Sequence, residues 1–316
     1  MSFTSDQQLA ELQDTYGLTL GQARALAAKT GVVRHLARDP KRSRRLVLKG
    51  GTLLHGVYGS PRVSIADVDY ADAAVGDSDG GEMAVAEEAP LTPEEVAEAV
   101  TFDEDGLKFK GIEGTWREGD ELVVGESVPF ELEDVEPLDA GGRDEQPLNI
   151  SVSVRKAEVV QGITVVRFRA AFIDEPEFGV SALALDEALV EKVISFSMKH
   201  FNKHYVDLAI AARDLRGLFD PEIVLSLFTR KLRAEKRRQP ERFKNVERAS
   251  DLFNRFHDRR ELERMIRSWS DVDKQLFLSL DEQELTEPGR VDELVTGYWT
   301  PILENLPTEQ LLDGET

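Results

Sequence analysis

The chain has 316 residues, of which 41% are hydrophobic and 31% charged, a balance typical of a folded globular protein rather than a disordered one. Its formal net charge of −21 argues against a protein whose whole surface coats nucleic acid, because an acidic surface repels polyanions on average. The sequence has no cysteine, which excludes disulfides and cysteine-ligated zinc, and since it has neither a signal peptide nor a long apolar run we expect a cytoplasmic protein without a membrane span.

The first part of the chain predicts two helices, over residues 5–14 and 19–38. Thr19 and Gln22 fit a capping box, in which each side chain binds the backbone N–H of the other residue. The second helix ends in a basic cluster, and two interpretations stay open: a solvated end that complements the helix dipole, or a rim that faces phosphate or RNA. The cluster consists of Arg34, Arg38, Lys41, Arg42, Arg44 and Arg45.

A glycine-containing turn follows a short apolar run at residues 46–48. Two adjacent glycines after such a run allow a sharp turn and leave backbone N–H groups able to face a phosphate. Residues 52–58 predict a short helix, whose positive dipole end would add to this attraction. The turn comprises Lys49, Gly50, Gly51 and Thr52.

Asp67 and Asp69 lie two residues apart within a segment that reads as a strand. With the period of two that a strand has, Ala66, Val68 and Tyr70 face a core, and the two carboxylates share the opposite face. Carboxylate oxygens arranged in this way can converge on Mg²⁺, which completes its shell with water and substrate phosphates. In a chain this acidic such pairs also arise by chance, but here the pair stands among apolar residues, which favours a metal site.

The middle of the chain changes character several times. Residues 71–91 are rich in Ala, Gly, Asp and Glu, and predict an acidic insertion rather than core. Thr92 and Pro93 then begin a helix that is expected to run to about residue 101. Three segments of period two follow, and we expect them to extend the sheet beside the aspartate pair. These segments are residues 107–112, 149–154 and 164–172.

Residues 182–200 return to a helical period, and Lys192 lies within their apolar stripe. A buried ammonium group without a partner is costly, so Lys192 either meets an anion such as a triphosphate or reaches solvent from the edge of the stripe. Further on, Asp207 and Asp214 are seven residues apart and share one helix face, so either is a candidate for the active centre.

The chain beyond Pro221 is expected to be helical, and it carries the densest basic tract of the sequence. One interpretation is a solvated helix face, and the other is a surface that docks RNA. The tract comprises Arg230, Lys231, Arg233, Lys236, Arg237, Arg238, Arg242, Lys244 and Arg248.

These motifs together resemble the AbiEii/AbiGii-type toxin nucleotidyltransferases of toxin–antitoxin systems. The resemblance rests on the run from Leu48 to Thr52, on Arg62-x-Ser64, and on the aspartate pair that follows. Two residues separate Ser64 from Asp67, where the family pattern has one. In the second half, Lys192 and Asp207 match the family signature, with His204 in place of its first aspartate and Asp214 as a competing match for the second.

The resemblance implies an α/β nucleotidyltransferase core with a mixed sheet, over residues 1–178, and an α-helical C-terminal domain over residues 179–316. It implies a toxin that transfers NMP from an NTP to RNA, with the 3′ end of tRNA as the expected acceptor, and so blocks translation when its cognate antitoxin is absent. A protein hydroxyl or a small molecule as acceptor is one alternative. A catalytically degenerate regulatory or binding protein is another.

The resemblance also implies roles for individual residues. Asp67 and Asp69 would bind Mg²⁺ or Mn²⁺, and the third carboxylate of the superfamily would be Asp174, Glu158 or neither. Lys192 would stabilise developing negative charge, while Asp207 would either orient Lys192 or help to deprotonate the acceptor hydroxyl. Nucleotide binding would fall to Lys49, Gly50, Gly51, Thr52, Arg62 and Ser64.

Overall fold

The protein is described here by a computed structural model, which forms two compact units. The first unit contains Met1–Val57, Ser64–Lys156 and Val165–Ala182, and the second contains Tyr58–Val63, Ala157–Thr164 and Leu183–Thr316. The division into domains after residue 178 stays a prediction. The structure describes residues 6–40, 42–65, 67–73, 91–104, 107–109, 116–117, 121–124, 151–155, 159–169, 177–269, 278–279 and 281–308.

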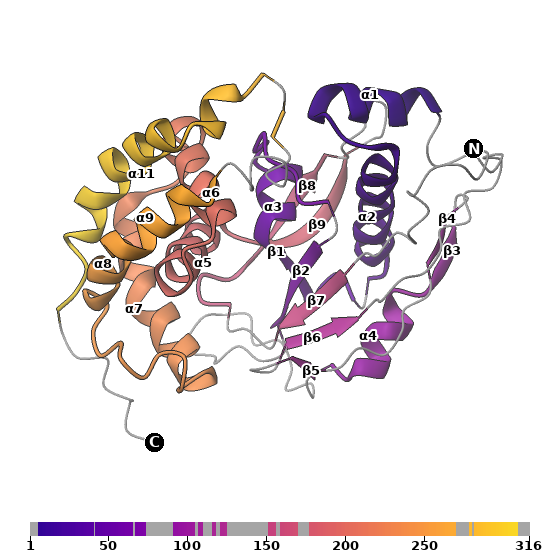
Figure 1. The fold of residues 1–316 in the computed structure, drawn as a ribbon. Coiled ribbons are helices and arrows are strands. Elements are labelled where there is room, and N and C mark those ends of the chain that lie inside the picture. Colours follow the sequence, from indigo (N-terminus) through magenta and orange to yellow (C-terminus); the bar gives the residue numbers. More distant parts are fainter. Residues whose placement is uncertain are drawn as a thin grey trace. The chain divides into compact units, whose positions relative to one another are not determined.

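A seven-stranded mixed sheet is the basis of the first unit. Its strands are β1 (Leu46–Lys49), β2 (Asp67–Asp72), β5 (Trp116–Arg117), β6 (Glu121–Val124), β7 (Ser151–Arg155), β8 (Ile163–Phe168) and β9 (Phe178–Leu183). They lie in the order β5-β6-β7-β2-β1-β9-β8 (Figure 1). β1 runs antiparallel to β2 and parallel to β9, and β2 runs parallel to β7. The mixed directions confirm the predicted α/β class.

Two of the four helices described in this unit begin at the caps that the sequence predicts. They are α1 (Asp6–Tyr16), α2 (Leu20–Arg38), α3 (Gly50–Gly56) and α4 (Pro93–Ala99). Thr19 and Gln22 form the expected capping box at α2, and Thr92 and Glu95 form another at α4. The long α2 packs against the sheet at β2 (Figure 1), and its buried face includes Leu26 and Val32, both with no exposed area. These caps and this apolar face place a rigid layer behind the aspartate strand.

The described part of the second unit is mainly helical after β9, as predicted. Its helices are α5 (Leu185–Met198), α6 (Asn202–Asp214), α7 (Pro221–Arg238), α8 (Asp251–Phe256), α9 (Arg259–Arg267), η2 (Gln283–Thr286) and α11 (Pro288–Leu303). Phe196 of α5 stacks on Tyr205 of α6, with ring centroids 4.7 Å apart. The indole N–H of Trp299 donates a hydrogen bond to the carbonyl of Leu208 at 2.9 Å, which ties α11 to α6. Within the described residues, no helix has the length and apolar character needed to cross a bilayer.

The predicted strands are placed differently from expectation in two cases. The segment at 149–154 is confirmed beside the aspartates, because β7 pairs with β2. The segment at 107–112 forms β4 (Leu107–Phe109), which pairs with β3 (Phe102–Glu104) in a separate two-stranded sheet. The segment at 164–172 forms β8, at the far edge of the sheet, because the unpredicted β9 lies between it and β1. Most of the predicted acidic insertion, residues 74–90, lies outside the described residues.

Candidate functional site

The turn between β1 and α3 is shaped by Gly50. Lys49 ends β1 in an extended conformation, and Gly50 then adopts a positive φ of 72°. A Cβ atom at Gly50 would lie 2.2 Å from Oδ2 of Asp69, closer than any two such atoms can approach. Glycine is therefore required twice, for the left-handed backbone and for the close approach of the carboxylate. The helix begins at Gly50 rather than at residue 52, so both glycines lie in its first turn.

The aspartates of β2 lie on the less buried face of the strand, as predicted. Asp67 is exposed and Asp69 is partly exposed, whereas Val68 and Tyr70 are buried at 0% and 3%. In the register of the sheet, Asp69 stands opposite Lys49 on β1 and beside Ser153 on β7. Since residues opposite one another in adjacent strands share a face, Asp69 is flanked by an ammonium side chain and a hydroxyl side chain.

Two hydroxyls that are predicted to bind nucleotide contact the backbone at the start of β2. Thr52 Oγ1, in a side chain that is 2% exposed, donates a hydrogen bond to the carbonyl of Asp67 at 2.9 Å. Ser64 Oγ donates to the same carbonyl at 3.3 Å. Both hydroxyls therefore help to hold the backbone of Asp67 in place.

Lys29 is a residue of this region that sequence reasoning missed. It is 1% exposed within α2, and its ammonium group donates a hydrogen bond to the carbonyl of Ser64. A lysine in the middle of the Ala- and Val-rich segment from Leu26 to Val33 was the available signal. Lys29 thus links the core of α2 to the segment that leads into Asp67.

The two aspartates fit a divalent cation that shares its shell with phosphate. Mg²⁺ in nucleotide sites is commonly held by one or two carboxylates, with phosphates and water completing the octahedron. Among the described residues, no group of three or more His, Cys, Asp or Glu side chains is placed to hold a metal ion. The neighbouring strand carries Ser151 and Ser153 in register with Asp67 and Asp69. The candidate third carboxylates, Asp174 and Glu158, lie outside the described residues.

A second cluster lies in the helical unit and joins Arg62, Lys192 and Asp207. Asp207 accepts two hydrogen bonds from the Arg62 guanidinium, at 2.6 and 3.0 Å. It also forms an ion pair with Lys192, whose Nζ lies 2.6 Å from Oδ2. All three are buried, at 5%, 7% and 1% exposure for Arg62, Lys192 and Asp207. Burial alone would raise the pKa of Asp207, but the two cations outweigh it and hold the pKa well below its ordinary value. Asp207 is therefore the partner that the buried Lys192 requires.

His204 adds an uncharged ring to this cluster. Burial, reinforced by the Lys192 ammonium, holds the pKa of His204 well below its ordinary value, so the imidazole is neutral near pH 7. Its Nδ1 is buried and has no hydrogen-bond partner in the described part of the chain. Because the imidazole is neutral, the cluster keeps a net charge of +1 from two cations and one anion.

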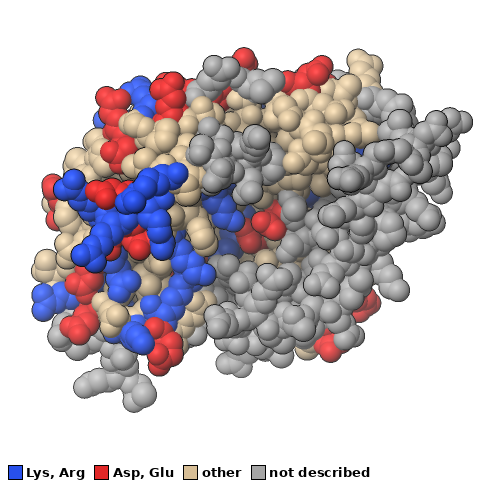
Figure 2. Space-filling model, viewed as in Figure 1, with Lys and Arg blue, Asp and Glu red and all other residues tan. Residues whose placement is uncertain are grey.

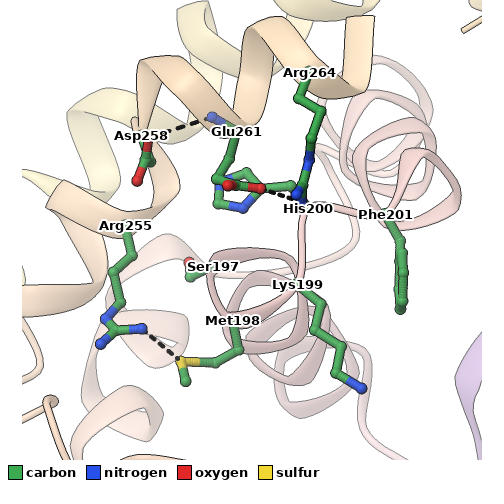
Figure 3. Close-up of a pocket in the computed structure, with 9 residues that line it drawn as sticks. All are labelled: Ser197, Met198, Lys199, His200, Phe201, Arg255, Asp258, Glu261 and Arg264. Atoms are coloured by element: carbon green, nitrogen blue, oxygen red, sulfur yellow. Dashed lines mark hydrogen bonds and ion pairs between the residues drawn. The ribbon is translucent and has the colours of Figure 1, made fainter. Parts of the chain in front are cut away.

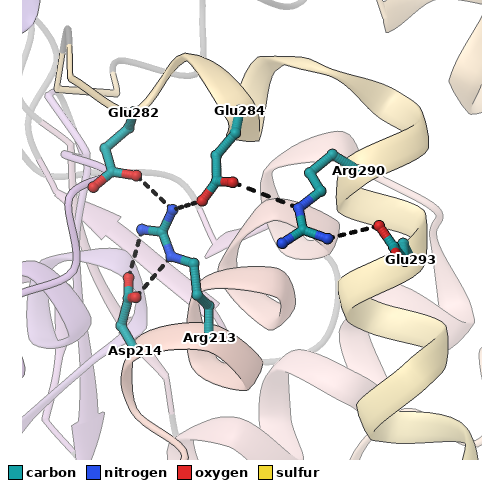
Figure 4. A network of polar contacts seen from close by, with 6 residues as sticks. All are labelled: Arg213, Asp214, Glu282, Glu284, Arg290 and Glu293. Carbon is teal, nitrogen blue, oxygen red and sulfur yellow. Dashed lines mark hydrogen bonds and ion pairs between the residues drawn. The ribbon is translucent and has the colours of Figure 1, made fainter.

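Asp214, the competing match, belongs to a different group of charges. Its carboxylate binds Arg213 at 2.7 Å, and Arg213 also pairs with Glu282 at 2.7 Å (Figure 4). Glu284 and Arg290 continue this group at the surface of the same unit. Of the two aspartates on α6, Asp207 is thus the one that contacts Lys192.

The basic tract on α7 is divided by burial. Lys231 is 1% exposed and pairs with Glu187 at 2.7 Å and Glu191 at 2.8 Å, so it stabilises the packing of α7 on α5. Glu187 also accepts hydrogen bonds from the backbone N–H groups of Val160 and Gln161. Lys231 is therefore removed from the set that could dock RNA. Exposed members of the tract include Arg230, Arg233 and Arg237.

Comparison with known proteins identifies the family of the chain. Residues 34–307 match the family described as "Nucleotidyl transferase AbiEii toxin, Type IV TA system". No curated protein sequence matches the chain. Among solved structures, the nucleotidyltransferase toxin MenT4 from Mycobacterium tuberculosis H37Rv has a similar fold, with a TM-score of 0.55 at 15% identity over 95% of this chain and 90% of MenT4. Because the family match covers most of the sequence, the chain belongs to the AbiEii family of nucleotidyltransferase toxins of type IV toxin–antitoxin systems.

Proposed function

We propose that this chain transfers a nucleoside monophosphate from an NTP to the 3′ end of an RNA, with tRNA as the expected acceptor. The observation that carries the proposal is the contact between Gly50 and Asp69. A Cβ atom at Gly50 would lie 2.2 Å from Oδ2 of the partly exposed Asp69, so a left-handed glycine turn whose N–H groups could bind phosphates lies directly against a carboxylate that could bind a metal ion. Blocked translation, a cytoplasmic location and neutralisation by a cognate antitoxin belong to the same proposal.

In the proposed reaction, the oxygen of the acceptor hydroxyl bonds to the α-phosphorus of the NTP. The bond from that phosphorus to the bridging oxygen breaks, pyrophosphate leaves with the bonding electrons, and the hydroxyl proton passes to solvent. A Mg²⁺ or Mn²⁺ ion bound by Asp67 and Asp69 would neutralise charge on the phosphate oxygens. Lys49, Gly50 and Gly51 are proposed to hold the phosphates from the turn.

The charged cluster of the helical unit supports a role in stabilising negative charge. The family resemblance assigns this role to Lys192, and the two buried cations around one carboxylate give the cluster a net charge of +1. Of the two roles considered for Asp207, the geometry supports the orientation of Lys192. Both of its oxygens are engaged and its pKa is strongly lowered, so it has little capacity to accept a proton. Arg62 is held in place by the same carboxylate.

The test is incubation of the purified protein with a divalent metal, total tRNA and each α-³²P-labelled NTP in turn. The expected result is label in RNA with one donor, and no label when Asp69→Ala replaces the wild-type protein. Label that persists with Asp69→Ala would contradict the assignment of Asp69 as a metal ligand. Label in protein or in a small molecule, with none in RNA, would favour the alternative acceptors.

The exposed part of the basic tract distinguishes an RNA acceptor from a small one. Replacing Arg230, Arg233 and Arg237 with alanine should raise the KM for RNA and weaken its dependence on salt, because each removed phosphate contact lowers the salt slope by about one. A small-molecule acceptor would be used equally well by the triple variant. Lys231 is left unchanged because its replacement would disturb the core.

A catalytically degenerate binding protein is the second candidate. It is favoured by the hydroxyls of Thr52 and Ser64, which contact the backbone of Asp67, and by the engagement of Arg62 with Asp207. Isothermal titration with each NTP, in the presence and absence of Mg²⁺, separates the two candidates. Metal-dependent NTP binding supports the enzyme, and its absence with every NTP supports the binding protein.

A further inference from the structure

A pocket in the helical unit is lined by residues to which no role has been given above. It has a volume of about 340 Å³ and is bordered by the turn between α5 and α6 and by α8 and α9 (Figure 3). Figure 2 shows that lysine and arginine side chains gather over α9 and the helices beside it, with acidic side chains among them. The pocket lining likewise contains both signs of charge, with Lys199, Arg255 and Arg264 beside Asp258 and Glu261.

Two buried polar groups in the pocket wall have no hydrogen-bond partner among the described residues. They are Oγ of Ser197, in a residue that is 3% exposed, and Nε2 of His200. Burial lowers the pKa of His200 below its ordinary value, so the ring is neutral near pH 7 and Nε2 donates or accepts a hydrogen bond according to the tautomer. Leaving a buried polar group without a partner destabilises the fold, and a polar ligand that supplies the partner would offset that cost.

The charges of the pocket leave two cations available for a ligand. Asp258 accepts hydrogen bonds from backbone N–H groups at the start of α9, including that of Glu261, and Glu261 forms an ion pair with Arg264 (Figure 3). The guanidinium of Arg255 contacts the sulfur of Met198 at 3.8 Å and no carboxylate among the described residues, and Lys199 carries no ion pair there. The acidic side chains are thus engaged, while Arg255 and Lys199 remain able to bind an anion.

Phe201 provides an exposed flat surface at the edge of this pocket. Of the large hydrophobic side chains that are exposed in the described part of the chain, Phe201 is the aromatic one, at 49%. Lys199 Nζ lies 5.9 Å from the centre of its ring, and the ring centre of His204 lies 6.0 Å away on the neighbouring turn. His204 in turn faces Lys192 and Asp207, so the pocket adjoins the charged cluster within the helical unit.

We propose that this pocket binds one nucleotide unit of single-stranded RNA. Arg255 and Lys199 lie on opposite sides of Met198 (Figure 3) and would each bind one of the two phosphates that flank the unit. Ser197 and His200 would form hydrogen bonds with the sugar and the base, and the base would stack on Phe201, the combination of groups used for single strands. Two cations suit a phosphodiester better than a triphosphate, and the exposed ring suits a base better than an acidic peptide. The inference rests on the proposed function, because it supplies a binding site for the RNA acceptor.

The test measures the affinity of the full chain for a short fluorescent single-stranded RNA by anisotropy, without NTP. Phe201→Ala should weaken binding at least about fivefold, because stacking contributes roughly 1–3 kcal/mol per base. Arg255→Ala should weaken binding and lower the salt slope by about 0.7, the value for one phosphate of a single strand.

Matched controls separate the pocket from general surface effects. Leu218→Ala removes an exposed apolar side chain elsewhere in the unit, and Arg259→Ala removes one positive charge whose side chain is 90% exposed. Both should bind RNA within about twofold of the wild type, since neither borders the pocket and surface changes have small effects. Thermal unfolding of all four variants checks that each is folded.

The inference is overturned if the pocket variants bind RNA as the controls do, or if the wild-type chain binds no RNA. It is also overturned if Phe201→Ala weakens binding of the antitoxin but not of RNA, or if ATP alone competes for the site as well as RNA does. The labelled-NTP assay keeps the two proposals apart. If Phe201→Ala transfers nucleotide to RNA with an unchanged KM, only the assignment of the pocket is contradicted. If RNA binding depends on Phe201 but no nucleotide is transferred, only the proposed reaction is contradicted.

Discussion

Asp69 on β2 and Asp207 on α6 are carboxylates in opposite environments. Asp69 is partly exposed and lies against a glycine turn, whereas Asp207 is 1% exposed and binds two cations. A carboxylate can hold a metal ion only while its oxygens are accessible, and a buried carboxylate contributes to stability only while it is paired. The comparison teaches that the first unit exposes a carboxylate suited to binding a metal ion, while the helical unit buries a carboxylate that holds two cations in place.

The largest effect is expected from Asp69→Ala on nucleotide transfer. Because a bound metal ion stabilises the transition state by several kcal/mol, its loss should lower the transfer rate about 10³-fold or more. The free energy of unfolding should change by less than about 0.5 kcal/mol, since a partly exposed side chain is removed. A large loss of stability, measured by urea denaturation, would contradict the assignment of Asp69 to chemistry.

Asp207→Asn should have the opposite profile. It leaves Arg62 and Lys192 buried without an anion, which should lower the free energy of unfolding by about 3–5 kcal/mol. Asp214→Asn on the same helix is the control, and it should cost less than about 1 kcal/mol because the Arg213 pair is partly exposed. Equal losses in the free energy of unfolding for the two variants would show that the buried cluster contributes no more to stability than the partly exposed Arg213 pair.

The pH dependence of stability tests the same contrast. The pKa of Asp207 is lowered in the folded state, so its contribution is fully present above its unfolded pKa of about 4 and is lost as the pH falls towards the folded value. The stability difference between the wild type and Asp207→Asn should therefore shrink below about pH 4. A difference that stays constant down to the acid transition would contradict the paired state.

Gly50→Ala tests the close approach to Asp69. The substitution places a Cβ atom 2.2 Å from Asp69 Oδ2 and forces a positive φ on alanine, so transfer should fall about 10- to 100-fold. Gly59→Ala is the control, because Gly59 has the same φ of 72° but no atom within 4 Å of the position that its Cβ would take. Both should lose about 1–2 kcal/mol of stability, and only Gly50→Ala should lose activity. Loss of activity in both would mean that backbone strain, rather than displacement of the carboxylate, is responsible.

The smallest effect is expected from Thr52→Val. It removes the hydrogen bond from Oγ1 to the carbonyl of Asp67, which should cost about 1 kcal/mol of stability and lower transfer several-fold. Thr30→Val removes a comparable buried hydrogen bond, to Leu26 within α2, and should cost similar stability without affecting transfer. Metal titrations of both variants would show whether the position of Asp67 matters.

The local features of this fold were predictable from sequence. The capping boxes at Thr19 and Thr92, the turn at Gly50 and the shared face of Asp67 and Asp69 depend on spacings of two or three residues, and the structure confirms each of them. The requirement that Lys192 find a partner also followed from its place in an apolar stripe. Such features depend on interactions between residues that are close in the sequence, and not on contacts between distant segments.

Features that depend on distant parts of the chain were missed. The pairing of Arg62 with Asp207 joins residues 145 positions apart, and Lys29 meets Ser64 across 35 positions. β9 was overlooked because a single residue separates it from α5, so its end was read as the start of the helix. Lys231 was counted among surface charges, because the sequence does not show that Glu187 and Glu191 approach it. In each case a contact formed only in the folded chain decides the role of the residue.

The separation of Arg62 from Asp207 also has a consequence during synthesis. Arg62 is synthesised before α6. Its counterion Asp207 is added only 145 residues later. Closing so long a loop is slow relative to the formation of local helices. Chains that terminate early, before residue 207, cannot assemble the cluster at all. Incomplete chains of this kind therefore have no carboxylate at position 207 to hold the Arg62 guanidinium in place.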